Sequence, residues 1–407
     1  MTYKPNIDIT VIGGGIVGLS TAALLSEAGF SIAVIDAGKL ETKPFSTESP
    51  YDLRVSAMNL ASMQIFRHLG IEDKILSERA SAYTQMHIWD ENSLAKIDFH
   101  ADDAQQEQLG YIIENNIIIN NLTNLLKEKS NVNLRPNTTL KSLEVSHDGI
   151  HLNLGNKTLH TQLLIGADGQ YSKVRSLSKI PTELGSFNQS AIVCRIQTEQ
   201  AHQQSAFQCF HLTGPIAYLP LNDGSSSIVW SCDTDYAKQI LALSDDEFAL
   251  AVEQAMQSKL GAVKLLSPRV GFDLAQQHAQ TYLASKTVLV GDAAHRTHPL
   301  AGLGANLGLQ DAAVLAETLI SANERKGFFN QHSTLRRYER IRKHQNALVL
   351  DAMQAFKSGF GSDAASASSV REFAFNRANQ FAPLKNLLSR LATGISGDLP
   401  EVCKPKW

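Results

Sequence analysis

The residues whose spacing best suits a chemical task lie near the start of the chain, in the segment GGGIVG. Gly13, Gly15 and Gly18 follow the pattern G-x-G-x-x-G. There the first glycine permits a sharp turn, the second lets the backbone approach a pyrophosphate, and the third lets helix and strand pack closely. Asp36, about 20 residues on, supplies a carboxylate for a ribose hydroxyl. These residues predict a dinucleotide site rather than an ordinary glycine turn.

A second glycine segment, GADGQYSKVR, runs from Gly166 to Arg175 after the apolar stretch Leu163–Ile165. Its Asp168-Gly169 pair is a turn signal. Two interpretations stay open: Asp168 belongs to a nucleotide site, or the segment is a plain turn in which Ser172 caps the next helix.

The third segment, GDAAHRTHPLAGLGANLG, runs from Gly291 to Gly308 and follows a buried strand. Asp292 could bind a polyol hydroxyl, and the amides around Gly302–Asn306 could stabilise negative charge on a ring system at a helix start. The alternative for Asp292 is a helix cap. His295 and His298 have nearly metal-like spacing, but the sequence shows no third ligand beside them, so we expect structural histidines and no metal site.

Strands and helices alternate around these segments in a way that would position them. The opening predicts a strand–helix–strand unit, and further strands precede the second and third glycine segments. The predicted elements are strands at Ile7–Ile12, Ser31–Ile35, Gln85–Trp89, Ile97–Phe99, Leu140–Val145, Ile150–Leu154, Leu163–Ile165 and Thr287–Val290, with helices at Ile16–Ala28, Ser56–Leu69 and Asn116–Lys129. We expect the chain to return to its first sheet at Leu163–Ile165.

The stretch from Pro181 to Tyr282 is strand-rich, which indicates an inserted sheet domain. Its predicted strands are Ala191–Ile196, Ala206–His211, Ile216–Leu221 and Ser227–Ser231, with one helix at Asp245–Lys259. The fold class is therefore α/β, with a discontinuous Rossmann-type FAD-binding domain (1–82, 108–180 and 282–330), a mixed β-sheet substrate domain (83–107 and 181–281) and a helical C-terminal region (331–407). Ser362–Ser369 is predicted to be a flexible loop.

Composition narrows the classes of partner. The chain has 407 residues, 43% of them hydrophobic, and a net charge of -3. A chain this long can bury a large core, and near-neutral charge gives no reason to expect a nucleic-acid partner. Its four cysteines form no CxxC pair, which disfavours a disulfide framework and favours a cytoplasmic location. We find neither a secretory signal nor an apolar run of roughly 18 residues that could span a membrane.

All three glycine segments, in this order, resemble those of the single-component flavin aromatic hydroxylases, the group that includes p-hydroxybenzoate hydroxylase. Within this group the chain is similar to the ubiquinone-biosynthesis hydroxylases. Three further segments carry the resemblance: LRVSAMN at Leu53–Asn59, LGYIIEN at Leu109–Asn115 and RYERIRKHQN at Arg337–Asn346. It spans nearly the whole chain, from Ile7 to the segment SGDLP near the end.

The resemblance implies a role for single residues. Arg54 matches an arginine that reaches the cofactor phosphates, although a surface ion pair is the alternative for it. Asp168 falls in the motif that supports FAD and reduced nicotinamide, and Asp292, after Gly291, matches the aspartate that binds the ribityl chain. The loop beside the isoalloxazine ring is matched by Pro299, Gly302, Gly304 and Asn306. Most relatives have a glutamine where this chain has Leu303.

The resemblance also implies a reaction. FAD would be the cofactor, NAD(P)H a transient reductant and dioxygen the oxidant, and the substrate would be a polyprenylated phenol of ubiquinone biosynthesis. The segment Arg79–Ser93 favours the first ring hydroxylation by similarity alone. The alternative is a catalytically weak or silent flavoprotein scaffold of the ubiquinone-biosynthesis complex. Whether other proteins of that pathway bind, and whether the chain forms a homo-oligomer, stays open.

Two further features, a basic helical face and a tyrosine, each allow a functional and a purely structural interpretation. Arg336, Arg340 and Lys343 share one helical face, which could contact anionic lipid at the inner membrane face or a partner protein, or could simply be solvated. Tyr218 could face the substrate, but core packing is the better expectation for it.

Overall fold

The computed structural model describes residues 7–42, 44–296, 303–325, 327–360, 393–394 and 398–404. The predicted loop Ser362–Ser369 lies outside this part of the chain, as do His298, Pro299 and Gly302.

The first sheet has the parallel core of a dinucleotide-binding fold. Its strands follow the order β18-β19-β11-β1-β2-β8, and β10 and β9 extend it beside β11. The strands from β19 to β8 are parallel, so β11 does return to the first sheet and lies next to β1. The bounds are β1 (Ile7–Ile12), β2 (Ile32–Ile35), β8 (Val132–Arg135), β9 (Ser142–Val145), β10 (Ile150–Asn153), β11 (Thr158–Gly166), β18 (Leu283–Ala284) and β19 (Thr287–Leu289).

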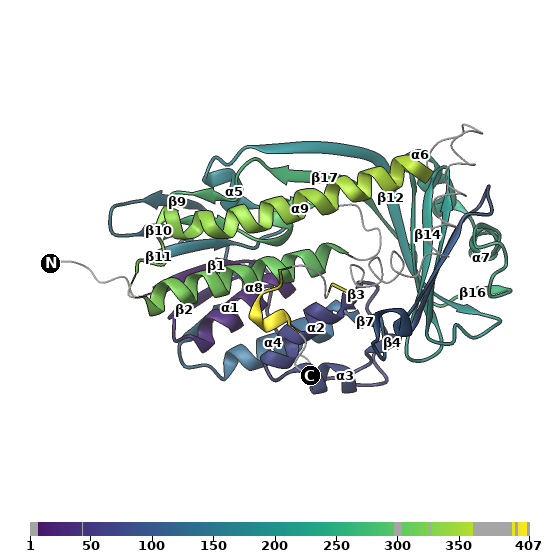
Figure 1. Ribbon diagram of the computed structural model, residues 1–407, viewed down its shortest axis with the longest axis horizontal. Coiled ribbons are helices and arrows are strands. Elements are labelled where there is room, and N and C mark those ends of the chain that lie inside the picture. The colour runs from purple at the N-terminus through teal and green to yellow at the C-terminus, as the bar shows by residue number, and fades with distance from the viewer. Residues whose placement is uncertain are drawn as a thin grey trace.

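Helices pack against this sheet (Figure 1). The helix after the first glycine segment, α1 (Ile16–Glu27), is buried along nearly its whole length. It packs against α4 (Asn115–Lys127) and α8 (Leu303–Glu324), and α8 in turn packs against α9 (His332–Phe360). Leu335 and Tyr338 of α9 belong to the same hydrophobic core as β1 and α1. No helix in the described ranges is long and apolar enough to cross a bilayer.

A nine-stranded sheet forms the other end of the molecule (Figure 1). Its order is β20-β17-β12-β15-β14-β13-β5-β6, and β16 pairs with β12. The bounds are β5 (Gln85–Asp90), β6 (Lys96–His100), β12 (Thr182–Thr198), β13 (Ser205–His211), β14 (Gly214–Pro220), β15 (Ser226–Asp233), β16 (Val263–Leu265), β17 (Val270–Ala279) and β20 (His295–Arg296). Tyr218 is 1% exposed and lies in the core between this sheet and its helices, which confirms core packing.

Two helices cover the outer face of this sheet where we predicted one. They are α6 (Thr234–Ala242) and α7 (Asp245–Ala255). The predicted end of the second helix at Lys259 was wrong because Gln257 and Ser258 adopt left-handed backbone angles, with φ of 52° and 51°. Such angles end an α-helix.

A three-stranded sheet, β3-β7-β4, joins the two larger sheets. It comprises β3 (Val55–Asn59), β4 (Ser81–Tyr83) and β7 (Gly110–Glu114). The predicted helix Ser56–Leu69 was wrong over its first four residues, because these pair antiparallel with β7. The helix α2 (Leu60–His68) starts only where the Asn59 side chain accepts a hydrogen bond from the amide of Ser62. Two short helices remain. The helix α3 (Glu72–Ser77) follows α2, and the helix α5 (Lys173–Leu177) begins at the end of the second glycine segment.

The division of the chain into domains stays a proposal, and sheet membership supports most of it. β5, β6 and β12–β17 share the nine-stranded sheet, whereas β1, β2, β11 and β19 share the first. His295–Arg296 pairs with β17, although we placed these residues in the FAD-binding part.

Candidate active site

The first two glycine segments form one turn region at the carboxyl ends of β1 and β11. Gly13 has a φ of +115°, and a Cβ at this position would lie 2.2 Å from the carbonyl oxygen of Ala167. A Cβ at Gly18 would lie 2.0 Å from the carbonyl oxygen of Gly13. Both close approaches require glycine. The strands β1 and β11 therefore end side by side, with the turn between them.

The start of α1 is free to receive an anion. Gly15 is the N-cap, and no side chain caps the helix. Within the part of the chain that the structure describes, no side chain therefore accepts from the amides of the first turn, which also lack intrahelical partners. Unlike Gly13, Gly15 has an ordinary φ of −80°, and no described atom lies within 4 Å of where its Cβ would be. The open space beside Gly15, at a positively polarised helix end, fits a pyrophosphate.

Asp36 closes the same region from the end of β2. Its carboxylate accepts hydrogen bonds from the amides of Gly14 (2.5 Å) and Gly38 (2.6 Å), and the residue is half-buried. Since a carboxylate offers about four acceptor positions, two remain for ribose hydroxyls. The predicted partners Gly13, Gly15, Gly18 and Asp36 are thus brought together.

Asp168 lies beside them but is engaged in the local structure. One carboxylate oxygen accepts from the amides of Lys173 (2.6 Å) and Val174 (3.1 Å), and the other from the hydroxyl of Ser172. Ser172 accepts from the amide of Arg175 at 3.0 Å. The capping interpretation of this segment therefore holds for Ser172, and Asp168 shapes the turn that packs against Gly13.

The third segment continues from β19 into a short 3-10 turn, η2 (Gly291–Ala293). Gly291 has a φ of +59°, and a Cβ at Gly308 would lie 2.6 Å from the Cγ2 of Val17. These glycines bring η2, α1 and α8 into contact. At the start of α8, no described atom lies within 4 Å of where a Cβ on Gly304 would be. The side chain of Leu303 is outside the described part.

Asp292 lies in η2 at an exposed position. The residue is exposed to solvent, yet burial by surrounding protein atoms raises the pKa of its carboxyl, against the opposite effect of His295 and Arg296. No hydrogen bond occupies it among the described residues, so it can accept one from a polyol hydroxyl.

A buried polar network holds this segment against the last long helix. Asp311 of α8 is fully buried, and it accepts hydrogen bonds from the amide of Gly291 (2.9 Å), pairs with His295 (2.5 Å) and accepts from the guanidinium of Arg342 (2.6 Å). His295 is thus a structural histidine, as expected, but a carboxylate does lie beside it. Sequence reasoning missed this contact because Asp311 lies 16 residues away along the chain.

The loop that carries Arg54 is anchored by a buried ion pair, Arg79–Glu114, at 3.3 Å. Arg79 donates to the carbonyl of Ser46 at 2.8 Å, and Glu114 accepts from the amide of Asp52 at 2.6 Å. Arg54 itself is exposed, and no salt bridge engages it among the described residues. This leaves its guanidinium available to a phosphate and disfavours the surface ion pair.

Asn306 connects the start of α8 to the small sheet. Its side chain donates to the carbonyl of Ala57 (2.8 Å) and accepts from the amide of Asn59 (3.0 Å) and the hydroxyl of Ser62 (2.7 Å). The side chain is therefore used inside the protein. The prediction that Asn306 lies beside a flavin ring therefore refers to its backbone at the start of α8 and not to its side chain.

A cavity of about 120 Å³ lies between β3 and the nine-stranded sheet. Cavities of about 150 Å³ are known to bind benzene, so this one is of a size for a single aromatic ring. The lining residues are Val55, Ala57, Tyr83, Met86, Ile112, Ala206, Phe207, Gln208, Pro215, Ala217, Leu219, Val229 and Ser231.

Three polar side chains line this apolar cavity: Tyr83, Gln208 and Ser231. Gln208 is 5% exposed and Ser231 is 2% exposed, and neither side chain forms a hydrogen bond to another described residue. Burial raises the pKa of Tyr83 to about 12, so its hydroxyl is a hydrogen-bond donor at neutral pH. Sequence reasoning missed all three, although a glutamine in the apolar strand SAFQCFH was a visible signal.

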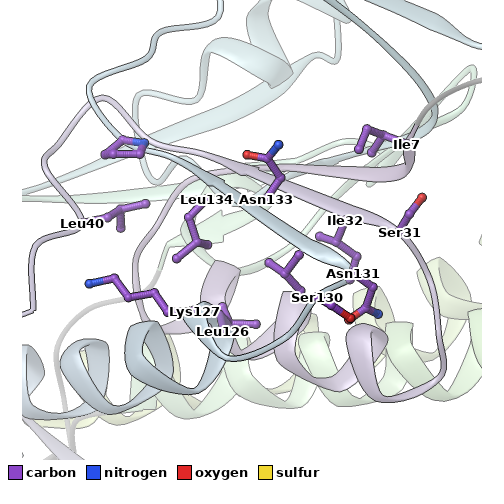
Figure 2. A pocket seen from close by; sticks show the side chains of 12 residues that line it. Ile7, Ser31, Ile32, Leu40, Leu126, Lys127, Ser130, Asn131, Asn133 and Leu134 are labelled. Carbon is purple, nitrogen blue, oxygen red and sulfur yellow. The ribbon is translucent and has the colours of Figure 1, made fainter.

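A larger recess is unrelated to these residues. Figure 2 shows its lining at the edge formed by β2, β8 and the end of α4, where Lys127 is its charged side chain. None of the predicted site residues lines it.

The comparisons with known proteins agree on one family. The model of the family described as FAD binding domain matches residues 6–352. The 3-demethoxyubiquinol 3-hydroxylase of Escherichia coli is 31% identical over 396 residues, covering 97% of this chain and all of that protein. A ubiquinone biosynthesis monooxygenase of Danio rerio, COQ6, is 32% identical, covering 95% of this chain and 89% of its own.

Solved structures show the same fold at lower identity. The p-nitrophenol 4-monooxygenase of Pseudomonas putida superposes with a TM-score of 0.75 at 18% identity, covering 94% of this chain and 96% of the other. PqsL of Pseudomonas aeruginosa, in complex with 2-aminobenzoylacetate, gives a TM-score of 0.75 at 19% identity, covering 89% of this chain and 99% of PqsL.

Proposed function

This chain belongs to the family of FAD-dependent aromatic hydroxylases that includes the ubiquinone-biosynthesis monooxygenases, and on that premise we propose that it hydroxylates the ring of a polyprenylated phenol. The observation that carries the proposal is the ring-sized apolar cavity. Strand β3 forms one wall of this cavity, and Asn306 at the start of α8 donates a hydrogen bond to the carbonyl of Ala57 in that strand. The resemblance puts the flavin ring at that helix start.

The residues present fit FAD. We propose that the turn at Gly13–Gly15 and the uncapped start of α1 hold the pyrophosphate, with Arg54 within reach of the phosphates. Asp36 then binds the ribose, Asp292 the ribityl chain, and the backbone from Pro299 to Asn306 the flavin ring. Bound FAD supplies the redox chemistry, in which NAD(P)H is the reductant and dioxygen the oxidant.

The protein's own task in the reaction is to bind and orient the substrate. We propose that the apolar walls of the cavity exclude water from the ring, while the Gln208 amide and the Ser231 hydroxyl hydrogen-bond to its oxygen substituents. Tyr83 can donate a third hydrogen bond. The polyprenyl tail then leaves the cavity towards the C-terminal helices, and the exposed Arg336 and Arg340 of α9 face an anionic membrane surface.

Two ring positions compete. Similarity over Arg79–Ser93 favours the first ring hydroxylation, and two residues of this segment, Tyr83 and Met86, line the cavity. The Escherichia coli relative is named for the 3-hydroxylation of 3-demethoxyubiquinol. We propose the first hydroxylation. Product analysis in cells blocked at each hydroxylation distinguishes the two, because only the blocked step that this chain performs is restored.

Anaerobic addition of NADH or NADPH to the yellow, FAD-loaded protein tests for an enzyme. We expect the flavin absorbance to bleach, faster when a prenylated phenol is present, and to return in air. A flavin that stays oxidised with substrate present would instead favour a silent scaffold protein.

A further inference from the structure

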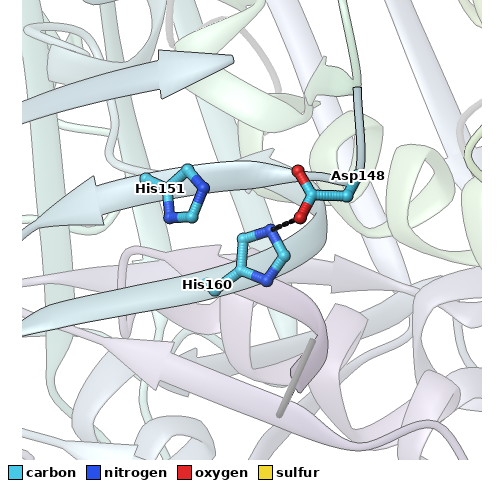
Figure 3. Close-up of side chains that lie close together, drawn as sticks. All are labelled: Asp148, His151 and His160. Atoms are coloured by element: carbon cyan, nitrogen blue, oxygen red, sulfur yellow. Dashed lines mark ion pairs between the residues drawn. The ribbon is translucent and has the colours of Figure 1, made fainter. Parts of the chain in front are cut away.

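Three side chains that can bind a metal ion meet on the first sheet, and none of them is among the residues of the proposed cofactor or substrate sites (Figure 3). Asp148 lies in the turn between β9 and β10, His151 lies on β10 and His160 lies on β11. One ligand atom from each lies within 4.8 Å of the others.

Strand pairing fixes the two histidines relative to each other. His151 is directly opposite His160 in the antiparallel pair β10–β11. Directly opposite residues lie on the same face of a sheet. Their rings stack with centroids 4.4 Å apart and an interplanar angle of 18°. The backbone therefore holds two imidazoles close together without any contribution from flexible loops.

The turn leaves room for a third ligand beside them. A Cβ on Gly149 would lie 2.5 Å from the Nε2 atom of His160. Any larger residue would collide with the imidazole. With glycine there, the Asp148 carboxylate comes to 3.8 Å from the same Nε2 atom, which is too far for a hydrogen bond.

His160 is the unusual member of the cluster. Both of its ring nitrogens are buried, and neither has a hydrogen-bond partner. A buried polar atom without a partner carries a desolvation cost of about 1–3 kcal/mol. A cation bound between His160, His151 and Asp148 would give one of these nitrogens a partner.

We propose that Asp148, His151 and His160 form a binding site for a divalent cation of the zinc class. Two imidazole nitrogens and one carboxylate oxygen are a ligand set that Zn²⁺ accepts, with water in the fourth position. The bound ion links the β9–β10 turn to β11, the strand that leads into the turn at Ala167 and Asp168.

The test is a titration of the FAD-loaded, untagged full chain with ZnCl₂, after removal of metal on a chelating resin. Isothermal calorimetry is expected to show one equivalent bound, and the melting temperature is expected to rise with Zn²⁺, because the ion binds only the folded state. His151→Ala and Asp148→Asn should each weaken binding at least about tenfold. Both positions are exposed, so both variants should fold.

The matched control is His147→Ala, an exposed histidine in the same turn but outside the cluster. It should bind Zn²⁺ as tightly as the parent chain. The proposal is overturned if the parent chain binds no Zn²⁺, or if His151→Ala binds it as tightly as His147→Ala does. FAD content and hydroxylation should not change in any of these variants, so the result is independent of the proposed function.

Discussion

Asn306 donates a hydrogen bond to the carbonyl of Ala57 across 2.8 Å. Asn306 lies in the first turns of α8, directly after the third glycine segment, and Ala57 lies on β3 and lines the ring-sized cavity. The same side chain also accepts from the amide of Asn59. A single residue therefore fixes the distance between the expected flavin position and the proposed substrate position.

Gly15→Ala separates cofactor binding from folding. The backbone angles at Gly15 suit alanine and no described atom lies near its Cβ position, so the free energy of unfolding of the FAD-free variant should equal that of the FAD-free parent chain or exceed it by about 0.4–1 kcal/mol. The methyl group would occupy the proposed pyrophosphate space, so we expect FAD to be lost on gel filtration. Gly13→Ala, with its φ of +115°, should impair both folding and FAD content. Full FAD occupancy in Gly15→Ala would refute the assignment.

Gln208→Leu should weaken substrate binding without weakening the fold. Leucine has a similar size, and the change breaks no hydrogen bond between Gln208 and another described residue because its amide lines the cavity, so the melting temperature should stay about the same. The lost hydrogen bond to substrate should raise KM for the phenol by about three- to tenfold, with a smaller change in kcat.

The control for that prediction is Gln276→Leu, a half-buried glutamine on β17 of the same sheet and outside the cavity lining. Its KM should equal that of the parent chain. If Gln208→Leu lowers stability and leaves KM unchanged, the amide has a structural role and the proposed substrate contact is wrong.

Asp311→Asn should destabilise the protein in a pH-dependent way. Burial alone would raise the pKa of Asp311, but His295 and Arg342 lower it below its ordinary value. A lowered folded-state pKa gives stability that is present above the unfolded-state pKa, at about pH 4 and higher, and is lost as the pH falls below it.

Urea unfolding measures this difference. At neutral pH the variant should lose about 3–5 kcal/mol, because the buried Arg342 is left without its counter-charge, and the difference in stability between the two proteins should start to shrink as the pH falls below about 4. Asp246→Asn, at an exposed position on α7, serves as the control and should behave like the parent chain. Equal stability of Asp311→Asn and the parent chain at neutral pH would contradict the account of this network.

Arg336→Glu combined with Arg340→Glu tests the basic face of α9. Lys343 is left intact because it donates a hydrogen bond to the carbonyl of Gln280. If this face contacts anionic lipid, sedimentation with phosphatidylglycerol vesicles should fall in the double variant and should fall with salt in the parent chain. Lys157→Glu combined with Lys264→Glu, both exposed elsewhere, is the matched control. Sedimentation equal to that control would mean that the face is only solvated.

The sequence predicted the start of the first sheet well because its signals are local, although it missed the short strands β8 and β18 of the same sheet. β1, α1 and β2 follow from apolar periodicity and from the glycines at the turn, and all three lie where we expected them. β3 and β7 were missed because each is five residues long and its partner lies about 50 residues away. Short strands of this kind are defined by pairing, which composition does not show.

The site was predicted only where a motif marked it. The glycines and Asp36 could be found from spacing, whereas Gln208 and Ser231 become candidates only once three strands bring them to one cavity. The Asp311–Arg342 pair could not be predicted either, because no sequence pattern links a buried aspartate on a helix to its partner 31 residues later.

The most direct test of the proposed function is incorporation of oxygen from ¹⁸O₂. FAD-loaded protein is mixed with NADH or NADPH and a short-chain 2-polyprenylphenol under ¹⁸O₂, and the product is examined by mass spectrometry. We predict a hydroxylated ring that carries one ¹⁸O atom, formed in proportion to the NAD(P)H consumed and reduced in Gln208→Leu. Oxidation of NAD(P)H that yields only hydrogen peroxide, or no oxidation at all with the prenylated phenol present, would contradict the account.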